Sequence, residues 1–381
     1  MINWEFYRKL FPVASNRTYL MTAGAGAVPI PVLDALADRY KQISERGGDV
    51  FGENLSVVEN CREKLATLIN AKKENIAFIP NVSYGINAIV HSMEADNLFL
   101  IPSNEFPSSI LPIKNAGKHI QEILPIPDCQ NNMINLLQHD YDKPSCLVAS
   151  WVNYIDGYRL DLDILKNYKK STDFVINGTQ AIGAFTIDVQ KYKIDVLVCS
   201  CYKWMCCGEG LSFLYIHPDF FKKLKPAFVG WRSIKSSMNF GTGEQIFFDD
   251  ARVFELGWTN MTLFSGFDAG LSLIQLIGVE NIAQRILSLS SELIQFLNYY
   301  EIPLITNSKS EHLSGIISIG PFENVDKIFE LLKRDNIWVN PRKNSIRISL
   351  HFYNNSQDIH RLVNSLNRIL TTEKNKINVS I

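Results

Sequence analysis

The feature that most constrains the fold of this chain is a series of short apolar segments that alternate with amphipathic stretches. Segments such as Cys146–Ser150, Phe174–Ile176 and Val196–Ser200 are apolar at almost every position. Strands of this composition are buried on both faces, which is typical of parallel sheets covered by helices. Stretches with helical periodicity, such as Ser83–Met93 and Leu160–Tyr168, supply the covering layers. The chain is therefore predicted to be an α/β protein with a mainly parallel sheet flanked by helices.

The pattern changes after about residue 260. Two long helices are predicted over Leu263–Ile277 and Ile282–Tyr299, and shorter strands and helices follow to about residue 370. This order predicts a large domain over residues 16–260 and a smaller C-terminal α+β domain over residues 261–381, joined by the N-terminal segment 1–15. No linker marks the boundary, so the change of pattern alone sets it.

Composition narrows the possible partners and the compartment. The formal net charge of the 381 residues is -1, which gives no electrostatic reason to expect nucleic acid or an anionic membrane as a partner. We find no signal peptide and no apolar run of membrane-spanning length. The seven cysteines have no framework spacing and no nearby histidine, so neither disulfides nor a metal site is expected. Reduced thiols predict a cytoplasmic location.

Lys203 stands just after the apolar segment Val196–Ser200, between Tyr202 and Trp204. Open α/β sheets bind ligands at the carboxyl ends of their strands. A lysine that is partly desolvated there has a lowered pKa and a nucleophilic amine, which an imine-forming lysine needs. The alternative is a surface lysine whose charged end reaches solvent.

A second segment, Phe174–Ile176, ends in Asn177-Gly-Thr-Gln180. In a site for pyridoxal 5′-phosphate (PLP), this strand end would meet the pyridine nitrogen, and Gln180 could donate to the ring hydroxyl. Because Asn-Gly is also a strong turn signal, the alternative is a turn with an exposed glutamine.

Three further groups are candidate ligands of a cofactor or substrate. The segment Pro80–Asn87 leads from a strand into a helix, and its first-turn N–H groups and Ser83 could hold a phosphate, although Asn81 or Ser83 could equally be a plain N-cap. Phe106 could stack on a planar ring or belong to the core. Arg347 shares its strand face with Ser345 and Ser349. It could bind the carboxylate of a substrate there, or it could form an internal ion pair or lie on an exposed face of the strand.

Together these pieces resemble the class V aminotransferase family of fold type I PLP enzymes. That family includes cysteine desulfurases, C–S lyases, kynureninase-like enzymes and isopenicillin N epimerase-like proteins. The segments that carry the resemblance are Thr18–Gly26, Pro80–Asn87, Glu105–Ser108, Ser150–Asp161, Asn177–Gly183, Ser200–Trp204, Gly208–Tyr215, Phe254–Asn260 and Arg347–Asn354.

The resemblance implies a role for each candidate. Lys203 would hold PLP as a Schiff base and move the α-proton of an amino-acid substrate, and Arg347 would bind its α-carboxylate. The implied cofactor-binding residues are Val82, Ser83, Phe106, Asn177, Gln180, Ser200, Tyr202 and Thr259. The loop Phe254–Asn260, which contains Thr259, would reach the phosphate of the neighbouring subunit, so a homodimer with shared active sites is implied.

Two departures from the family pattern guide the expected reaction. The last cysteine is Cys207, so the persulfide-carrying loop of cysteine desulfurases is absent. Asn177 stands where the family usually has an aspartate, and a neutral amide supplies no charge to keep the pyridine nitrogen protonated. We therefore expect a lyase (β-elimination, C–S lyase-like) or an epimerase acting at Cα or Cβ. The alternatives are ordinary transamination and a catalytically decayed binding protein. Substrate selectivity is expected from Val229–Arg232 and Trp258.

Overall fold

The structure is a computed structural model that describes residues 2–94, 96–125, 128–236, 238, 244–257 and 259–379, with side chains described as far as residue 372. Trp258, one of the expected selectivity residues, lies outside the described residues.

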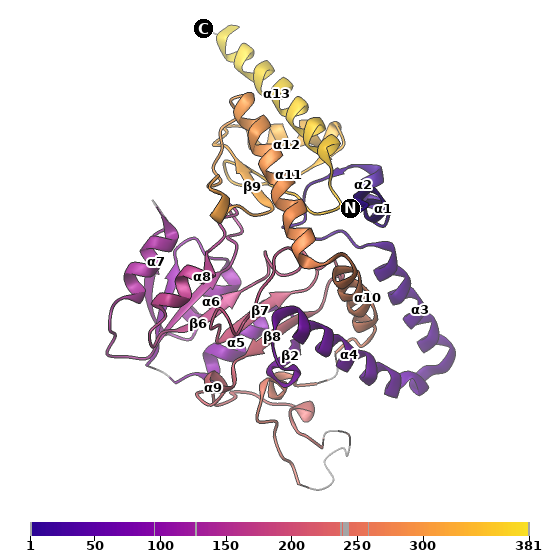
Figure 1. The fold of residues 1–381 in the computed structure, drawn as a ribbon, viewed down its shortest axis with the longest axis vertical. Coiled ribbons are helices and arrows are strands. Elements are labelled where there is room, and N and C mark those ends of the chain that lie inside the picture. The colour runs from indigo at the N-terminus through magenta and orange to yellow at the C-terminus, as the bar shows by residue number, and fades with distance from the viewer. Residues whose placement is uncertain are drawn as a thin grey trace.

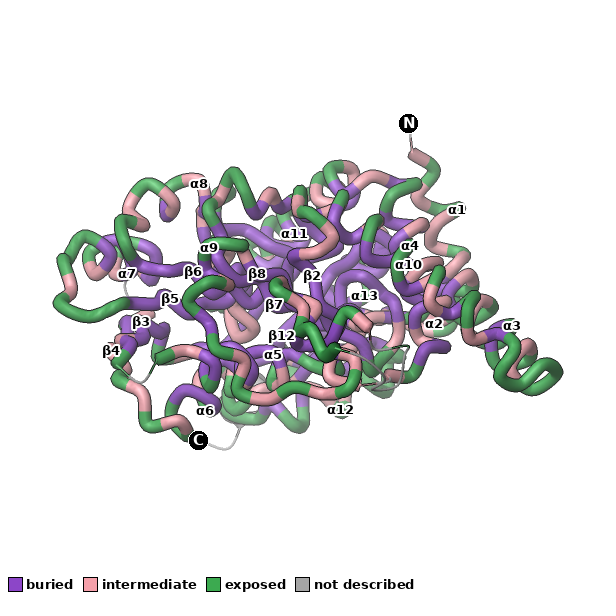
Figure 2. The backbone as a smooth tube through the Cα atoms, turned by 90° about the horizontal axis from the view of Figure 1, so that it is seen from below, coloured by how far each residue is buried: buried purple, intermediate pink, exposed green. Residues whose placement is uncertain are grey.

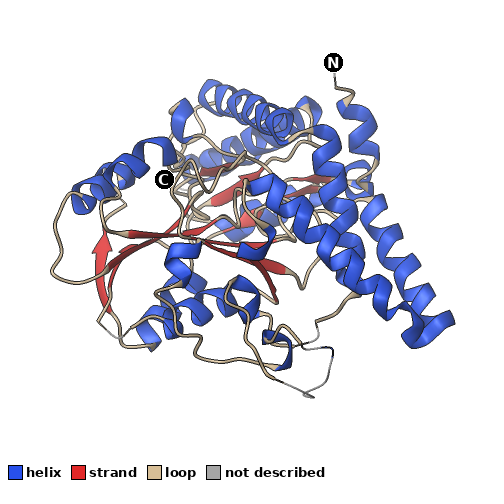
Figure 3. Ribbon diagram, turned by 60° about the horizontal axis from the view of Figure 1, so that its bottom comes forward, coloured by secondary structure: helices blue, strands red, loops and turns tan. Residues whose placement is uncertain are grey.

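A central sheet of seven strands in the described residues confirms the predicted α/β class (Figure 3). The strand order is β2-β8-β7-β6-β5-β3-β4. Strand β8 pairs antiparallel with both of its neighbours, and the other pairings are parallel. The strands are β2 (Ile76–Ile79), β3 (Leu98–Pro102), β4 (His119–Ile123), β5 (Ser145–Ser150), β6 (Asp173–Asn177), β7 (Val196–Ser200) and β8 (Ser212–Ile216).

Both faces of this sheet are buried, as the apolar segments predicted (Figure 2). Along β7 the side chains alternate between two hydrophobic clusters. Val196 and Val198 join one cluster, whereas Leu197 and Cys199 join the other. The period of two along one strand therefore explains why an uninterrupted apolar run is needed here.

Helices cover both faces of the sheet, as Figure 3 shows. The α-helices of both parts of the chain are α1 (Trp4–Lys9), α2 (Pro12–Asn16), α3 (Ile30–Arg46), α4 (Phe51–Ile69), α5 (Val82–Ser92), α6 (Pro107–Asn115), α7 (Cys129–Leu137), α8 (Leu162–Leu165), α9 (Pro218–Phe221), α10 (Thr262–Ile277), α11 (Val279–Tyr299), α12 (Val325–Arg334) and α13 (Ser356–Val379). The helix predicted over Leu160–Tyr168 is shorter in the structure, where α8 is followed by a 3₁₀ turn over Lys166–Tyr168.

Two elements of the large sheet and its helices have weak local signals and were not expected. Strand β4 lies at the edge of the sheet and is partly exposed, so its sequence His-Ile-Gln-Glu-Ile lacks the apolar run of the central strands. Helix α6 carries Pro107 in its first turn and Pro112 in its interior, and an interior proline argues against a helix in sequence-based prediction.

The C-terminal part forms a second layer with its own core (Figure 1). Strands β11 (Asn340–Pro341), β12 (Ile346–Ser349) and β9 (Ile316–Ile319) form an antiparallel sheet beside α11, α12 and α13. The N-terminal segment joins this part: β1 (Thr18–Tyr19) pairs with β10 (Ile337–Trp338), and Arg8 Nη1 lies 2.7 Å from Asp358 Oδ2.

The division between the two hydrophobic cores does not coincide with the change of pattern seen in the sequence. Helix α10 shares the core of the large sheet, whereas the C-terminal core takes up α11 from Leu289 onward and also contains Leu20. The boundary at residues 260/261 stays a prediction. All seven cysteines carry free, buried thiols.

In the described ranges, no single helix has the length and hydropathy of a membrane span. Only α10 and α11 counted together pass such a test, across a bend of 77°.

Candidate active site

The carboxyl ends of the parallel strands open into a cavity of about 250 Å³. Ser150, Asn177 and Ser200 are the last residues of β5, β6 and β7, so the sheet register brings them to one edge. The cavity lining includes every predicted cofactor residue except Thr259, together with Lys203. Its lining residues are Asn81, Val82, Ser83, Phe106, Ser108, Ser150, Tyr154, Asn177, Thr179, Gln180, Ser200, Tyr202 and Lys203.

Lys203 is buried at the base of this cavity, which excludes the alternative of a surface lysine. Burial is the main reason that the pKa of its amine falls from 10.5 to about 8, and the positive charges of Arg347 and Arg342 lower this pKa further. Its Nζ lies 5.7 Å from the ring centroid of Phe106 and 5.6 Å from that of Tyr202. At pH 7 about a tenth of the amine is therefore neutral and nucleophilic, far more than at the ordinary pKa of 10.5.

The loop that carries Lys203 is fixed from several sides. Trp204 donates from Nε1 to Gln180 Oε1 at 2.8 Å, and its carbonyl oxygen accepts from His351 Nε2 at 3.0 Å. Burial lowers the pKa of His351 to about 4, so this histidine is neutral. Gly26 packs directly against the loop, and a Cβ on it would lie 2.0 Å from the carbonyl oxygen of Lys203. Sequence reasoning gave Gly26 no role, because only tertiary contact creates it.

Asn177 and Gln180 are buried, so the alternative of a turn with an exposed glutamine is wrong. Asn177 Oδ1 accepts from the N–H of Thr179 at 3.1 Å, and its Nδ2 donates to Ser109 Oγ at 3.2 Å. Because a backbone N–H can only donate, the Thr179 contact fixes the orientation of the amide. One N–H and one lone pair of Asn177 remain available to a ligand.

Gln180 has one amide hydrogen to offer the cavity. Its Nε2 donates to the carbonyl oxygen of Ala23 at 2.9 Å, and its Oε1 is occupied by Trp204. The second hydrogen on Nε2 is the group that could meet a ring hydroxyl, as predicted.

A second group of lining residues is suited to a phosphate. Asn81 caps α5 by accepting from the N–H of Tyr84 at 2.8 Å, which confirms the capping alternative for that residue. The N–H groups of Val82 and Ser83 have no acceptor within the helix and lie at its positive end. The hydroxyls of Ser83 and Ser108 are 2.8 Å apart, and Ser200 adds a third hydroxyl to the lining.

Phe106 is half-buried and lines the cavity rather than belonging to the core. Its position depends on Glu105, a buried carboxylate that sequence reasoning did not single out. Glu105 Oε1 accepts from the N–H of Phe106 at 2.6 Å, and Oε2 accepts from the N–H of Ser150 at 2.5 Å. Burial raises the pKa of Glu105, against these hydrogen bonds. Glu105 thus ties the ring segment to the end of β5.

Arg347 is buried on β12 and contacts only neutral groups. It donates from Nη1 to the carbonyl oxygen of Tyr154 at 2.7 Å and from Nη2 to Asn340 Oδ1 at 3.0 Å. Within the described residues it forms no ion pair, so the alternatives of an internal ion pair and an exposed face are not observed. Because Tyr154 lines the cavity, Arg347 lies directly behind the wall. The predicted alternation of side chains along this strand is confirmed, since Ile346 and Ile348, which flank Arg347, belong to the C-terminal core.

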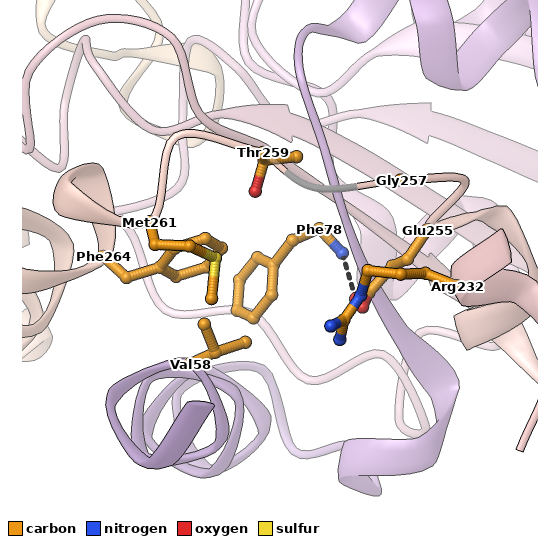
Figure 4. Close-up of a pocket in the computed structure, with 8 residues that line it drawn as sticks. All are labelled: Val58, Phe78, Arg232, Glu255, Gly257, Thr259, Met261 and Phe264. Atoms are coloured by element: carbon orange, nitrogen blue, oxygen red, sulfur yellow. Dashed lines mark hydrogen bonds between the residues drawn. The ribbon is translucent and has the colours of Figure 1, made fainter. Parts of the chain in front are cut away.

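Thr259 does not reach this cavity within one chain. It lines a separate small pocket beside Phe78, Met261 and Phe264 (Figure 4). The loop before it is anchored by Glu255, whose Oε1 accepts from the N–H of Phe78 at 2.8 Å and pairs with the buried Arg62 at 2.7 Å. The predicted contact of Thr259 with a cofactor therefore requires a second subunit and stays a prediction.

The donor set fits PLP. The lining combines serine hydroxyls and free N–H groups, an amine of lowered pKa, an aromatic face and two buried amides. In the described part of the chain, no group of three or more His, Cys, Asp or Glu residues could hold a metal ion.

Comparisons with known proteins agree with this geometry. The family model described as aminotransferase class-V matches residues 18–362. An uncharacterized aminotransferase, YcbU of Bacillus subtilis, is 24% identical over 366 residues, covering 95% of this chain and 97% of the relative. A probable cysteine desulfurase of Pyrococcus abyssi is 24% identical over 402 residues, covering 96% of this chain and 97% of the relative. A structure of the cystine C–S lyase C-DES has a TM-score of 0.86 at 21% identity and covers 94% of this chain and 99% of that chain.

Proposed function

The chain belongs to the class V aminotransferase family, and from this premise we propose that it is a lyase or epimerase acting at Cα or Cβ of a small amino acid. It is a PLP-dependent enzyme of fold type I. The observation that carries the finer proposal is the buried, neutral Asn177 at the end of β6.

PLP, when bound, withdraws electrons from the α-carbon of an amino acid joined to its aldehyde carbon. Lys203 would hold that aldehyde, and Phe106 would cover the ring. The N-terminus of α5 with Ser83 and Ser200 would hold the phosphate, and the free N–H of Gln180 would meet the ring hydroxyl.

Asn177 favours reactions that need a weaker electron sink. An aspartate in its place would hold a proton on the ring nitrogen by its charge, whereas an amide supplies none. The contacts to Thr179 and Ser109 restrain the amide and leave it one donor and one acceptor. A weaker sink disfavours full transamination and is compatible with racemisation or with elimination of a good leaving group at Cβ.

Lys203 and Arg347 supply the remaining steps. Elimination and epimerisation both begin with removal of the α-proton, and an amine with a pKa of about 8 is a competent base near neutral pH. Arg347 would fix the α-carboxylate and so present the α-proton to Lys203.

Two related activities compete with this proposal. Transamination is the second candidate, because the Bacillus subtilis relative carries the name of an aminotransferase. Cysteine desulfuration is disfavoured although relatives carry that name, because no cysteine follows Cys207 and a tight turn over Arg342–Ser345 joins β11 to β12.

The proposal extends to assembly and location. A homodimer would bring the Thr259 loop of one subunit to the phosphate-binding residues of the other, which would explain why Thr259 lines a pocket separate from the Lys203 cavity of its own chain. Seven free thiols support a reducing, cytoplasmic compartment.

The test begins with borohydride reduction of the purified holoenzyme and peptide mass analysis. A reduced cofactor on Lys203 is expected, and a cofactor on another residue would overturn the proposed chemistry. An amino-acid panel then separates the reactions by ammonia release, α-proton exchange in D₂O and amino transfer to a keto acid. Amino transfer that is faster than the other two would refute the lyase or epimerase assignment.

The variant Asn177→Asp tests the observation itself. It should shift the product ratio towards amino transfer by roughly tenfold or more, since the new charge stabilises a protonated ring nitrogen. Asn344→Asp, which adds the same charge at an exposed position, is the matched control and should leave the ratio unchanged.

A further inference from the structure

A second arginine lies beside Arg347 on the same face of a hairpin. Strands β11 and β12 pair antiparallel, with Asn340 opposite Arg347, and the N–H of Arg342 donates to the carbonyl oxygen of Ser345 at 2.8 Å. Arg342 follows Asn340 by two residues, so it shares that face and is the diagonal neighbour of Arg347.

Neither guanidinium group lines the Lys203 cavity, but both are near enough for their charge to act on Lys203. Arg347 donates to the backbone of Tyr154, a residue of the cavity wall. The positive charges of Arg342 and Arg347 both lower the pKa of Lys203, after the larger effect of burial. Arg342 also lowers the pKa of Arg347, again after burial.

Neither arginine has an anionic partner in the described part of the chain. The hydrogen bonds of Arg347 go to a carbonyl and an amide oxygen, and Arg342 donates from Nη1 to the carbonyl oxygen of Pro341 at 3.1 Å. The Nε atoms of both side chains are buried without an acceptor. Two adjacent, partly desolvated cations without a counter-charge are unfavourable unless a ligand supplies that charge.

Some other shielded arginines are paired with a carboxylate, whereas Arg159 and Arg285 bond only to backbone carbonyl oxygens. Arg62 lies 2.7 Å from Glu255, and Arg8 lies 2.7 Å from Asp358. At Arg342 and Arg347, by contrast, two guanidinium groups without a carboxylate in the described residues are neighbours on one hairpin face.

We propose that the substrate carries two anionic groups, with its α-carboxylate on Arg347 and an anionic side-chain group on Arg342. The substrate class is thus an amino acid whose short side chain ends in a carboxylate or a similar oxyanion. The planar fork of Arg342 suits such a group, because guanidinium binds two oxygens at once. This inference rests on the proposed function for the role of Arg347.

Binding of unreactive carboxylates to the holoenzyme tests the inference without turnover. Succinate and butyrate have the same number of carbons, lack an amine and differ by one carboxylate. Isothermal titration should show succinate binding roughly tenfold or more tightly than butyrate, because charge-assisted hydrogen bonds are the strong ones. Equal affinities would overturn the inference.

Variants then test whether the difference in affinity between succinate and butyrate depends on the side chain of Arg342. Arg342→Gln should raise the Kd for succinate to that for butyrate and leave butyrate binding unchanged, whereas Arg342→Lys should keep part of the preference. Lys343→Gln removes the same charge from the exposed neighbouring residue and should leave both affinities unchanged. Equal weakening of both ligands by Arg342→Gln would show a merely structural role and would also overturn the inference.

Turnover gives a second, independent comparison. The enzyme should exchange the α-proton of aspartate in D₂O faster than that of its isostere asparagine, and Arg342→Gln should remove that preference. Failure of the proposed function would be recognised separately, as the absence of a reducible cofactor link at Lys203 with carboxylate binding intact. If Arg342→Gln does not fold, the wild-type affinity ratio and Arg342→Lys still decide the outcome.

Discussion

Lys203 imposes a stability cost on the cofactor-free protein, and the structure gives its size. The pKa of its amine is about 8 in the folded chain against an ordinary 10.5. At about 1.4 kcal/mol for each tenfold change in protonation, the buried charge costs about 3 kcal/mol. The variant Lys203→Met keeps a long side chain and removes the charge. It should therefore raise the free energy of unfolding of the apoprotein near pH 7.

The sign of the pH dependence follows from proton binding. Between pH 8 and 10.5 the unfolded chain holds a proton on Lys203 that the folded chain has lost. The contribution of Lys203 to the free energy of unfolding of the wild type therefore rises with pH across that window. The advantage of Lys203→Met should be complete below about pH 8 and should vanish above about pH 10.5. Loss of the cation–π contacts with Phe106 and Tyr202 subtracts about 1 kcal/mol from the gain.

Urea denaturation of both apoproteins, repeated at several pH values, measures this difference directly. Lys343→Met is the matched control, because it removes an exposed lysine from the same region and should change stability little at any pH. A Lys203→Met variant that is no more stable than the wild type near pH 7 would refute the desolvation argument. A gain that does not decline towards high pH would refute it too.

Two further predictions concern the supports of the site. Glu255→Gln should destabilise the protein by about 3 to 5 kcal/mol, because it leaves Arg62 as a buried charge with only the half-exposed Glu59 as a partner. Urea denaturation measures this loss of stability. A change below about 1 kcal/mol would contradict the prediction. Gly26→Ala should impair retention of the cofactor, because the new Cβ would lie 2.0 Å from the carbonyl oxygen of Lys203. Gly48→Ala, where a Cβ meets nothing within 4 Å, is its control, and dialysis followed by absorbance measures retention.

The local pattern of apolar and polar residues was sufficient to predict most of the fold. The apolar runs of β5, β6 and β7 identified buried parallel strands, because burial on both faces leaves no place for polar residues. The same reasoning failed at β4, an edge strand with polar positions, and at α6, where prolines conceal a helix that tertiary packing stabilises.

Strand ends were equally informative about the site. Because parallel strands end at one edge, the residues that follow them had to meet, and Asn177, Ser200 and Lys203 line one cavity. Glu105 was overlooked, since nothing local shows that its carboxylate would bind the N–H groups of Phe106 and Ser150.

The amino-acid sequence by itself therefore determined the class of fold, the edge of the sheet that carries the chemistry and the residues gathered there. Each of these follows from periodicity or from neighbours along the chain. Only the tertiary structure decided the pKa of Lys203, the need for glycine at position 26 and the lack, among the described residues, of a counter-charge beside Arg342 and Arg347. These properties depend on burial and on distances between residues far apart in sequence, which no local pattern encodes.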